Sequence, residues 1–408
     1  MGAPAARAAE LSRYWAEAGH QVTVLTGFPN HPTGVVPHPY RSKLHRLVMR
    51  ERVREVDVVR TWLLPLPNRK PHERMLNYSS FCLSAACTGL FLSRPEVVIA
   101  SSPQLLVGLS GWWLARSMRV PFIFEVRDLW PESLAAVGVG GPESLLHRGL
   151  GRIAGFLYRN ASRIVVVTHA FEDHLIKHWN VPRETIRVIE NGVDTELFSP
   201  HASDTSLRSA LHMEGKFVVC YIGTMGMAHG LDTLIDAATR LRDMVPDVVF
   251  LLVGEGAEKE RIISLARARG LTNLRFVDQQ PREKIPAYIR ASDASIVMLK
   301  KTELFKTVIP TKLLEFMACA RPVILAVDGE ARKLLESAEA GVFVEPENVA
   351  ALVEAVIRLR DDAALRERTG RAGRRYIVEN LSRARTAAQY LDLLGALVPN
   401  SSQLSVAA

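Results

Sequence analysis

The stretch PTKLLEFMACARPV, residues 310–323, carries the clearest local signal in this chain. Its pattern predicts a helix that begins after Pro310, followed by the apolar strand PVILAV at 322–327. A helix N-terminus presents free backbone N–H groups and a partial positive charge, which suit a phosphate. Glu315 lies about one turn into this helix, where its carboxylate can accept two hydrogen bonds from a ribose diol. The stretch therefore favours a seat for a nucleoside diphosphate. The alternative is an ordinary amphipathic helix with a surface glutamate.

Short apolar runs bounded by glycine or proline alternate with helical periods through most of the chain. Strands rich in Val, Ile and Leu that alternate with helices indicate parallel sheets covered on both faces. The pattern occurs twice, so we expect an α/β fold of two tandem Rossmann-like, doubly wound domains that bind ligands at the carboxyl ends of their strands. The predicted strands are 21–26, 96–101, 121–126, 163–168 and 187–192 in the first half, and 216–223, 247–254, 274–278, 294–299 and 322–327 in the second.

The boundary between the two domains is expected in the polar stretch 195–215, which contains Pro, Ser and Asp. We assign residues 1–195 to the first domain and 196–380 to the second. An amphipathic helix at 381–398 would complete the first domain, and residues 399–408 are expected to form a frayed tail. The total length of 408 residues agrees with two domains.

The start of the chain differs from that of an ordinary doubly wound domain, which begins with a strand. Here Met1-Gly-Ala-Pro leads directly into a predicted helix, AARAAELSRYWAEAG, and then into the strand QVTVLT. We therefore expect that a first strand and its turn, about 15 residues, are missing. Loss of this central strand should destabilise the first domain.

The composition narrows the class of protein. A chain with 48% hydrophobic and 23% charged residues is globular. Its four cysteines are scattered and lack metal-ligand spacing, which argues against disulfides or a zinc site and favours a reducing cytosol. Although the net charge is +8, no basic motif is interleaved with aromatic residues, so nucleic acid is not an expected partner.

A basic segment precedes a weakly polar run. Between Arg41 and Arg74 the chain has ten Lys and Arg against four Asp and Glu, and the run from Met75 to Leu92 follows directly. A basic segment beside an apolar helix suggests attachment to an anionic membrane surface. The alternative is a solvated basic loop followed by a buried core helix.

Several segments in this order resemble retaining glycosyltransferases of family 4, which have the GT-B fold. The likeness is greatest to bacterial enzymes of O-antigen, capsule and colanic-acid assembly, including the L-fucosamine transferase type. It covers nearly the whole chain. The segments are GAPAARAAELSRYWAEAGHQVTVLTGFPNHPTG (2–34), FEVRDLWPES (124–133), IENGVD (189–194), YIGTMGMAHGLDTLI (221–235), VGEG (253–256) and PTKLLEFMACARPV (310–323).

The resemblance implies that the second domain binds a nucleoside diphosphate sugar and the first receives the acceptor, with the reaction in the cleft between them. Glu315 matches the family's glutamate that holds the donor ribose, and Thr311, Lys312 and Leu313 would lie at the diphosphate. The family's other glutamate stands eight residues earlier, where this chain has Thr307. That departure weakens the case for an acid contact to the donor sugar.

The glycine loop GTMGMAHG, which starts at Gly223, also departs from the family pattern. Thr224 and His229 stand where the family usually has Arg and Lys. Phosphate stabilisation would then come from a protonated His229, from loop N–H groups or from Lys312. The alternatives are a dinucleotide fingerprint, which the loop does not match, or a plain strand-to-helix turn. Arg282 is a further candidate for the base or phosphate, or else a solvated charge at a helix start.

In the first domain, Arg127 and Asp128 follow the strand PFIFEV, at a place where loops carry chemistry. Asp128 would orient the acceptor hydroxyl and Arg127 would bind acceptor phosphate. The alternative is an Arg–Asp pair that only fixes the loop. The resemblance also places the turn at Asn191 and Gly192 near the cleft, and Gly2 in the turn after the missing strand.

The function expected from the resemblance is sugar transfer, with retention, from a nucleoside diphosphate sugar to a lipid-linked saccharide on polyprenyl diphosphate. The donor is expected to be a UDP-N-acetylamino sugar, and no metal or other cofactor is expected. The enzyme would work in the cytoplasm, peripherally on the inner face of the cytoplasmic membrane, in surface polysaccharide assembly. Two alternatives remain open: a nucleotide-sugar 2-epimerase of the same fold and a non-catalytic scaffold.

Overall fold

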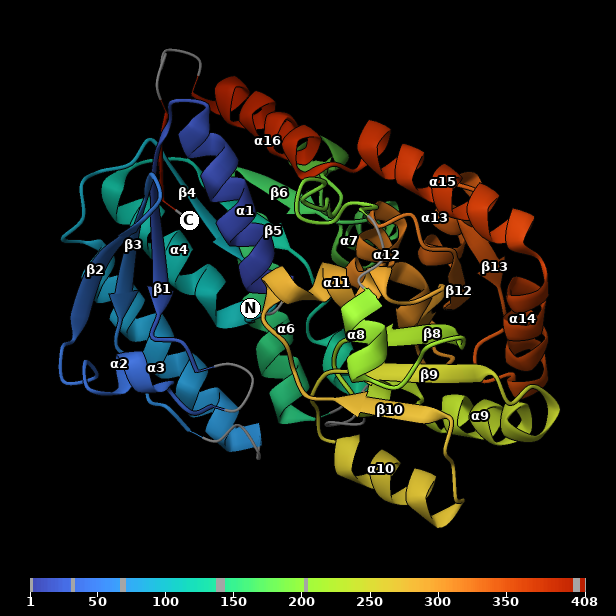
Figure 1. Cartoon of the computed structure of the whole chain (residues 1–408). Helices are drawn as coiled ribbons and strands as arrows, with labels where there is room; N and C mark the ends of the chain where they lie inside the picture. Colours follow the sequence, from blue (N-terminus) through green and yellow to red (C-terminus); the bar gives the residue numbers. More distant parts are fainter. Residues whose placement is uncertain are drawn as a thin grey trace. The chain divides into compact units, whose positions relative to one another are not determined.

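The computed structural model of the chain describes residues 3–30, 34–66, 71–136, 144–201, 205–398 and 404–407. The chain divides into two compact units, residues 1–190 with 384–408 and residues 191–383. Each unit is built on one sheet with helices packed against it (Figure 1). The expected α/β class with two Rossmann-like parallel sheets is therefore confirmed.

The first unit contains an eight-stranded sheet in the order β2-β3-β1-β14-β4-β5-β6-β7. All neighbouring strands are parallel except β2 and β3, which form an antiparallel pair. Its strands are β1 (Gln21–Gly27), β2 (Val48–Val53), β3 (Val56–Thr61), β4 (Val97–Ser101), β5 (Phe122–Val126), β6 (Arg163–Val166), β7 (Ile186–Val188) and β14 (Ser405–Ala407). Its main helices are α1 (Ala3–Glu17), α2 (His38–Arg41), α3 (Pro71–Gly89), α4 (Leu105–Met118), α5 (Glu132–Ala136), α6 (Leu145–Asn160), α7 (His169–Trp179) and α16 (Arg383–Leu397).

Strand β14 lies in the middle of this sheet. Its residues fall within 399–408, which were predicted from the sequence to form a frayed tail. Val406 pairs in parallel with Val22 of β1 and with Val97 of β4, and only 1% of its surface is exposed. The N–H of Leu404 donates to His20 Nδ1, and the N–H of Ser405 donates to a Glu96 carboxylate oxygen. The tail prediction was therefore wrong for residues 404–407, because a central sheet position supplies partners that a free tail lacks.

The second unit contains a six-stranded, all-parallel sheet in the order β10-β9-β8-β11-β12-β13. The strands are β8 (Phe217–Ile222), β9 (Val248–Val253), β10 (Leu274–Val277), β11 (Ala294–Met298), β12 (Val323–Ala326) and β13 (Gly341–Phe343). The helices are α8 (Thr205–Ala210), α9 (Asp232–Met244), α10 (Lys259–Ala268), α11 (Ile285–Arg290), α12 (Thr311–Ala318), α13 (Glu330–Ser337), α14 (Val349–Asp361) and α15 (Ala363–Asn380), with short 3₁₀ turns at η2 (Met227–His229), η3 (Arg282–Lys284) and η4 (Leu304–Thr307).

Both faces of this second sheet are covered, as its apolar strands predict. Val219 and Tyr221 of β8 point into one hydrophobic cluster, whereas Val218 and Cys220 point into the other. The alternation follows from the two-residue period of a strand. The carboxyl ends of β8 and β9 therefore rest on a rigid, fully buried base.

The boundaries between the units, at 190/191 and 383/384, lie a few residues from the expected 195/196 and 380/381. The reason is a short pairing of backbone within the second unit. Val193 forms a parallel bridge with Ser382, and Arg383 donates its backbone N–H to the Val193 carbonyl. Val193 and Ser382, which were both expected in the first domain, therefore belong to the second unit.

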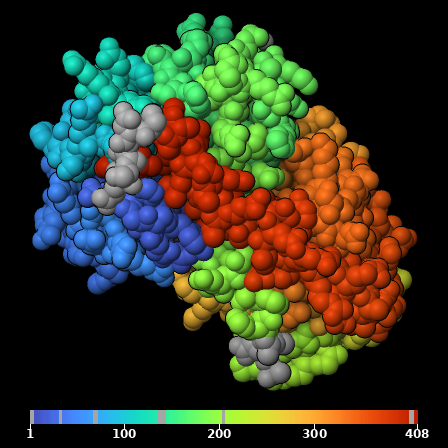
Figure 2. Space-filling view, turned by 90° about the horizontal axis from the view of Figure 1, so that it is seen from above, coloured from blue at the N-terminus to red at the C-terminus, as the bar shows by residue number. Residues whose placement is uncertain are grey.

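Helix α16 packs against α1 within the first unit, and Figure 2 shows its red residues beside the blue N-terminal helix. The Trp15 indole N–H donates to the Ala387 carbonyl at 3.2 Å, and the Trp15 and Tyr390 rings meet edge to face at 5.2 Å. These contacts join the two ends of the described chain in one core.

Candidate functional site

Two glycine-containing loops meet at the carboxyl ends of β8 and β9. Gly223 follows β8 with φ of 139°, and Gly254 follows β9 with φ of 151°. A Cβ added at Gly254 would collide with the Gly223 carbonyl, so the two loops are in direct backbone contact. The site therefore needs glycine here for close approach as well as for its backbone angles.

Helix α12 presents Lys312 to the first of these loops. A Cβ placed on Gly223 would lie 2.9 Å from Lys312 Nζ, so the ammonium group lies directly against the loop backbone. The same Nζ lies 4.2 Å from the centroid of the Tyr221 ring. The Nζ atom is buried and has no hydrogen-bond partner among the described residues. The rest of Lys312 is partly exposed, so the residue as a whole is half-buried. A buried amine at a helix start that has no hydrogen-bond acceptor among the described residues is an arrangement that an anion would complete.

The environment of Lys312 lowers its pKa to about 7, because burial disfavours the charged form and Glu315 offsets this only in part. The pKa of His229, at the end of η2, is also lowered. Burial, assisted by the charge of Lys312, lowers the pKa of His229 to about 3. In the free protein the imidazole is therefore neutral at physiological pH, and phosphate stabilisation by a protonated His229 stays a prediction.

Arg282 and Glu315 form an ion pair. Arg282 Nη1 donates to Glu315 Oε1 at 2.5 Å, and each side chain is 12% exposed. The Arg282 guanidinium also lies 4.8 Å from the centroid of the buried Phe198 ring. The two residues were predicted as separate site residues, whereas in the structure their side chains are in direct contact. Arg282 thus fixes the orientation of the carboxylate expected to bind ribose.

Leu313 and Thr307, which were also predicted to bind the donor, make hydrogen bonds within their own helix or turn. The Leu313 side chain is fully buried and its N–H donates to the Pro310 carbonyl, so the diphosphate proposal rests on Thr311 and Lys312. The Thr307 hydroxyl donates to the Leu304 carbonyl at the end of η4.

Thr224 is exposed, and its carbonyl accepts a hydrogen bond from the Tyr221 hydroxyl. The predicted turn at Asn191 and Gly192 starts the second unit, where the Gly192 carbonyl accepts a hydrogen bond from the buried Arg383. Gly2 lies outside the described residues. In the described part of the chain, no group of three or more His, Cys, Asp or Glu side chains is placed to hold a metal ion.

In the first unit, Arg127 and Asp128 follow β5 as expected. The Arg127 backbone N–H donates to Ser102 Oγ at 2.7 Å, and the Ser133 hydroxyl lies 3.4 Å from Asp128 Oδ1. Burial raises the pKa of Asp128 to about 6, against the opposing effects of Ser133 and Arg127. A carboxylate with this pKa is ionised at neutral pH and suited to accept a proton.

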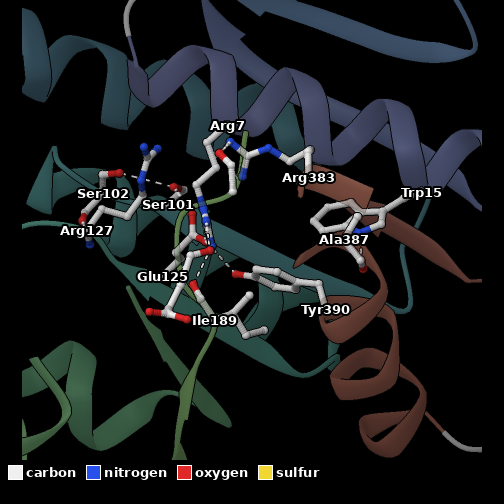
Figure 3. A network of polar contacts seen from close by, with 12 residues as sticks. Arg7, Trp15, Ser101, Ser102, Glu125, Arg127, Ile189, Arg383, Ala387 and Tyr390 are labelled. Carbon is white, nitrogen blue, oxygen red and sulfur yellow. Dashed lines mark hydrogen bonds and ion pairs between the residues drawn. The ribbon is translucent and has the colours of Figure 1, made fainter. Parts of the chain in front are cut away.

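A buried polar network lies directly before this loop (Figure 3). Glu125 Oε1 accepts hydrogen bonds from Arg7 Nε and from the Tyr390 hydroxyl, both at 3.0 Å, and Oε2 accepts one from Ser101. Burial alone would raise the pKa of Glu125, but the charges of Arg7 and Arg127 with these bonds lower it to about 2.

This network was not predicted, although Glu125 stands as an acid inside the apolar strand PFIFEV and was a visible signal in the sequence. Arg7 further donates to the carbonyls of Ile189 and Glu190. The network therefore anchors the end of β5, where the loop with Asp128 begins, to α1 and α16.

Comparison with known proteins covers both halves of the chain. The family described as "Glycosyl transferase 4-like domain" matches residues 2–192, and the family described as "Glycosyl transferases group 1" matches residues 203–376. Both halves thus belong to glycosyltransferase families. The resemblance noted from the sequence is confirmed at this level, and the fold is of the GT-B type.

One relative of this glycosyltransferase is the "putative colanic acid biosynthesis glycosyl transferase WcaI" of Escherichia coli. It is 26% identical over 397 residues, which cover 94% of each chain. Among solved structures, sucrose-phosphate synthase from Thermosynechococcus elongatus superimposes with a TM-score of 0.78 at 22% identity, covering 98% of this chain and 94% of that one. The Anabaena protein HepE in complex with UDP-glucose gives 0.70 at 17% identity, covering 93% and 100%. The two structures show a shared fold.

Proposed function

We propose that this glycosyltransferase moves a sugar from a nucleoside diphosphate sugar to a lipid-linked glycan, with retention, in surface polysaccharide assembly. The observation that carries the donor proposal is Lys312 Nζ, which is buried against the Gly223 loop without a hydrogen-bond partner among the described residues. A diphosphate there would complete the site, because it supplies the anion that the buried cation lacks.

The roles in this proposal follow from the geometry of each unit. Lys312, Thr311 and the N–H groups of the Gly223 loop stabilise the charge on the leaving diphosphate. Glu315, oriented by Arg282, accepts hydrogen bonds from the donor ribose. Asp128 orients the acceptor hydroxyl, with Arg127 beside it for an acceptor phosphate. No resident metal or cofactor is assigned a role.

The donor and acceptor are proposed from the relatives. HepE was solved with UDP-glucose, which supports a UDP sugar as the donor. The description of WcaI names colanic acid biosynthesis, which supports a polysaccharide precursor on polyprenyl diphosphate as the acceptor. We further propose an N-acetylamino sugar for the donor and a peripheral place on the inner face of the cytoplasmic membrane.

The test begins with a thermal-shift panel of UDP, GDP and ADP. A ligand that binds only the folded state raises the melting temperature, so we expect a shift with UDP that exceeds the other two. Lys312→Met should abolish the shift, whereas Lys333→Met, on the exposed side of α13, should retain it. Absence of a shift with all three nucleotides would refute the donor site.

Transfer itself is measured with UDP-N-acetylglucosamine and a polyprenyl diphosphate saccharide. A product with the donor's anomeric configuration, assigned by NMR, supports retention. Conversion of the donor in the absence of any acceptor would instead identify an epimerase. Nucleotide binding without turnover of any donor and acceptor pair would favour a non-catalytic scaffold.

A further inference from the structure

Helix α3 exposes an apolar stripe on the first unit. Leu76, Leu83 and Cys87 are exposed, and their spacing of seven and four residues places them on one side of the helix. Just beyond its end, Phe91 is 84% exposed. Residues 75–93 contain no charged side chain. Asn77 and Ala85 are buried, so part of this helix packs in the core, as the alternative reading of the run expected.

Helix α4 continues this surface. It packs against α3 on one side and against α6 on the other. Trp113 of α4 is 46% exposed, and no charged residue occurs between Val97 and Ala115. The outward sides of α3 and α4 together thus present large apolar groups to solvent where an ordinary surface helix carries charges.

Helix α6 adds the positive charge. Its Leu145 and Leu146 are exposed, and so are its three arginines, Arg148, Arg152 and Arg159. Helices α3, α4 and α6 contain five arginines against a single acid, Glu73. We call the outward sides of these three helices the outer helical face.

We propose that the outer helical face docks on an anionic lipid surface, with its leucines and Trp113 in the headgroup boundary and its arginines at the lipid phosphates. The biological reason for this docking rests on the proposed function, because a lipid-linked acceptor lies at a membrane. Its evidence is separate, namely exposed apolar groups next to a strong excess of positive charge. None of the described helices is long and apolar enough to cross a membrane, so the contact is with the surface.

Charge decides between lipid and a second copy of this chain as the occupant. Two copies facing each other through this face would bring like-charged arginines together, which is unfavourable. An anionic bilayer instead offers negative charge to every arginine at once. Trp113 also suits an interface, because its ring is apolar and its N–H remains able to bond water or headgroups.

Vesicle flotation tests the apolar part of the face. The full chain should bind vesicles of phosphatidylglycerol and phosphatidylethanolamine and float poorly with phosphatidylcholine alone. The variant Leu83→Ser/Trp113→Ser should bind the anionic vesicles roughly tenfold more weakly. Met244→Ser removes a side chain of similar exposure, 60% against 69% for Leu83, from the second unit and should bind like the parent.

A second pair of variants tests the charge. Arg152→Glu should weaken binding to anionic vesicles by about fivefold or more. Arg368→Glu, an exposed arginine of α15 in the second unit, should leave it unchanged. Equal loss in the two variants would mean that net charge alone drives binding, which would overturn the assignment to this face.

In a Cys82→Ser background, which removes the partly buried cysteine of the same helix, Cys87 reports the contact directly, because it is exposed whereas Cys220 and Cys319 are buried. Anionic vesicles should slow its alkylation by a maleimide at least severalfold. Unchanged alkylation while the protein is vesicle-bound would overturn the proposal. A dimer in lipid-free sedimentation that Leu83→Ser dissociates would assign the face to a second copy.

The outcomes separate this inference from the proposed function. All variants should keep the parent's thermal shift with UDP, because the proposed donor residues lie in the second unit. A parent that responds to UDP but does not float refutes the docking proposal alone. A parent that floats without any nucleotide response refutes the donor site alone.

Discussion

The carboxylate of Glu315 accepts a hydrogen bond from the guanidinium of Arg282 at 2.5 Å, in a pair that is almost out of contact with solvent. This pairing changes what a substitution at Glu315 measures. Glu315→Ala removes a proposed ribose ligand and also leaves the Arg282 charge without its carboxylate. A loss of nucleotide affinity in that variant therefore has to be compared with its loss of stability.

We predict that Arg282→Ala and Glu315→Ala each lower the free energy of unfolding by about 3 kcal/mol, because each removes the ion-pair partner of a largely buried charge. The double variant should lose clearly less than the sum. Urea unfolding measures all three. The exposed pair Arg332 and Glu336 is the matched control and should cost less than about 1 kcal/mol. Strict additivity at Arg282 and Glu315 would contradict a coupled pair.

Lys312→Met should stabilise the free protein at pH 7. In the folded chain the pKa of Lys312 is about 7, below the ordinary 10.5, so between these values the unfolded chain binds more protons. The cost of burying this lysine is therefore full below pH 7 and is relieved as the pH rises toward 10.5. Unfolding measured from pH 6 to pH 10 should show the advantage of Lys312→Met shrinking with rising pH. An advantage that does not change with pH would place the effect in packing alone.

Binding of UDP near pH 8 should take up a proton. At that pH Lys312 is largely neutral in the free protein, and a diphosphate beside it favours the charged form. The nearest titratable neighbours do not change state there, because the pKa of His229 is lowered and that of Tyr221 is raised. Calorimetry in two buffers of different ionisation enthalpy measures the uptake. The uptake should vanish in Lys312→Met.

Asp128→Asn should reduce kcat by about 100-fold or more if Asp128 acts on the acceptor hydroxyl. Burial raises the pKa of Asp128 to about 6 from 3.8, so the folded state binds more protons between these values. Its contribution to stability falls as the pH rises through 6, and Asp128→Asn should be at least as stable as the parent at pH 8. The rate of transfer by the parent should fall below about pH 6. Asp173→Asn, an exposed change on α7, is the control for both measurements.

Arg7→Met should destabilise the first unit by about 3 kcal/mol at pH 7, because Glu125 would keep its charge in a buried site. The pKa of Glu125 is lowered from 4.5 to about 2, so its stabilising contribution is present above 4.5 and is lost as the pH falls toward 2. Arg7→Met/Glu125→Gln should recover part of the loss in urea unfolding. Failure to recover would mean that Arg7 acts mainly through the carbonyls of Ile189 and Glu190.

Of the ten strands that the sequence predicted, nine coincide closely with observed strands, and the tenth, 187–192, shares only residues 187 and 188 with β7. Strands β2 and β3 were not predicted because charged residues interrupt the apolar residues of VMRERV and VDVVRT, so neither forms a continuous apolar run. The segment was instead judged by its net basic charge. Strand β14 is only three residues long, so its sequence carries almost no local signal.

The candidate site was predictable residue by residue but not as a set of contacts. A motif placed Glu315 and Lys312 on one helix start, and this is how α12 presents them. The partner of Glu315 comes from η3, and the ring beside Lys312 comes from β8, so both depend on how the sheet is assembled. The neutral state of His229 likewise follows from burial, which no spacing of residues reveals.

The position of β14 has a consequence for the order in which the two units fold. Its neighbours β1 and β4 leave the ribosome early, and the entire second unit is synthesised before residues 404–407 appear. The second unit is contiguous from 191 to 383 and has all its strands as soon as it is made. During translation the first sheet therefore waits with an open central position, and the half of the enzyme that is translated second is the half that finishes folding first.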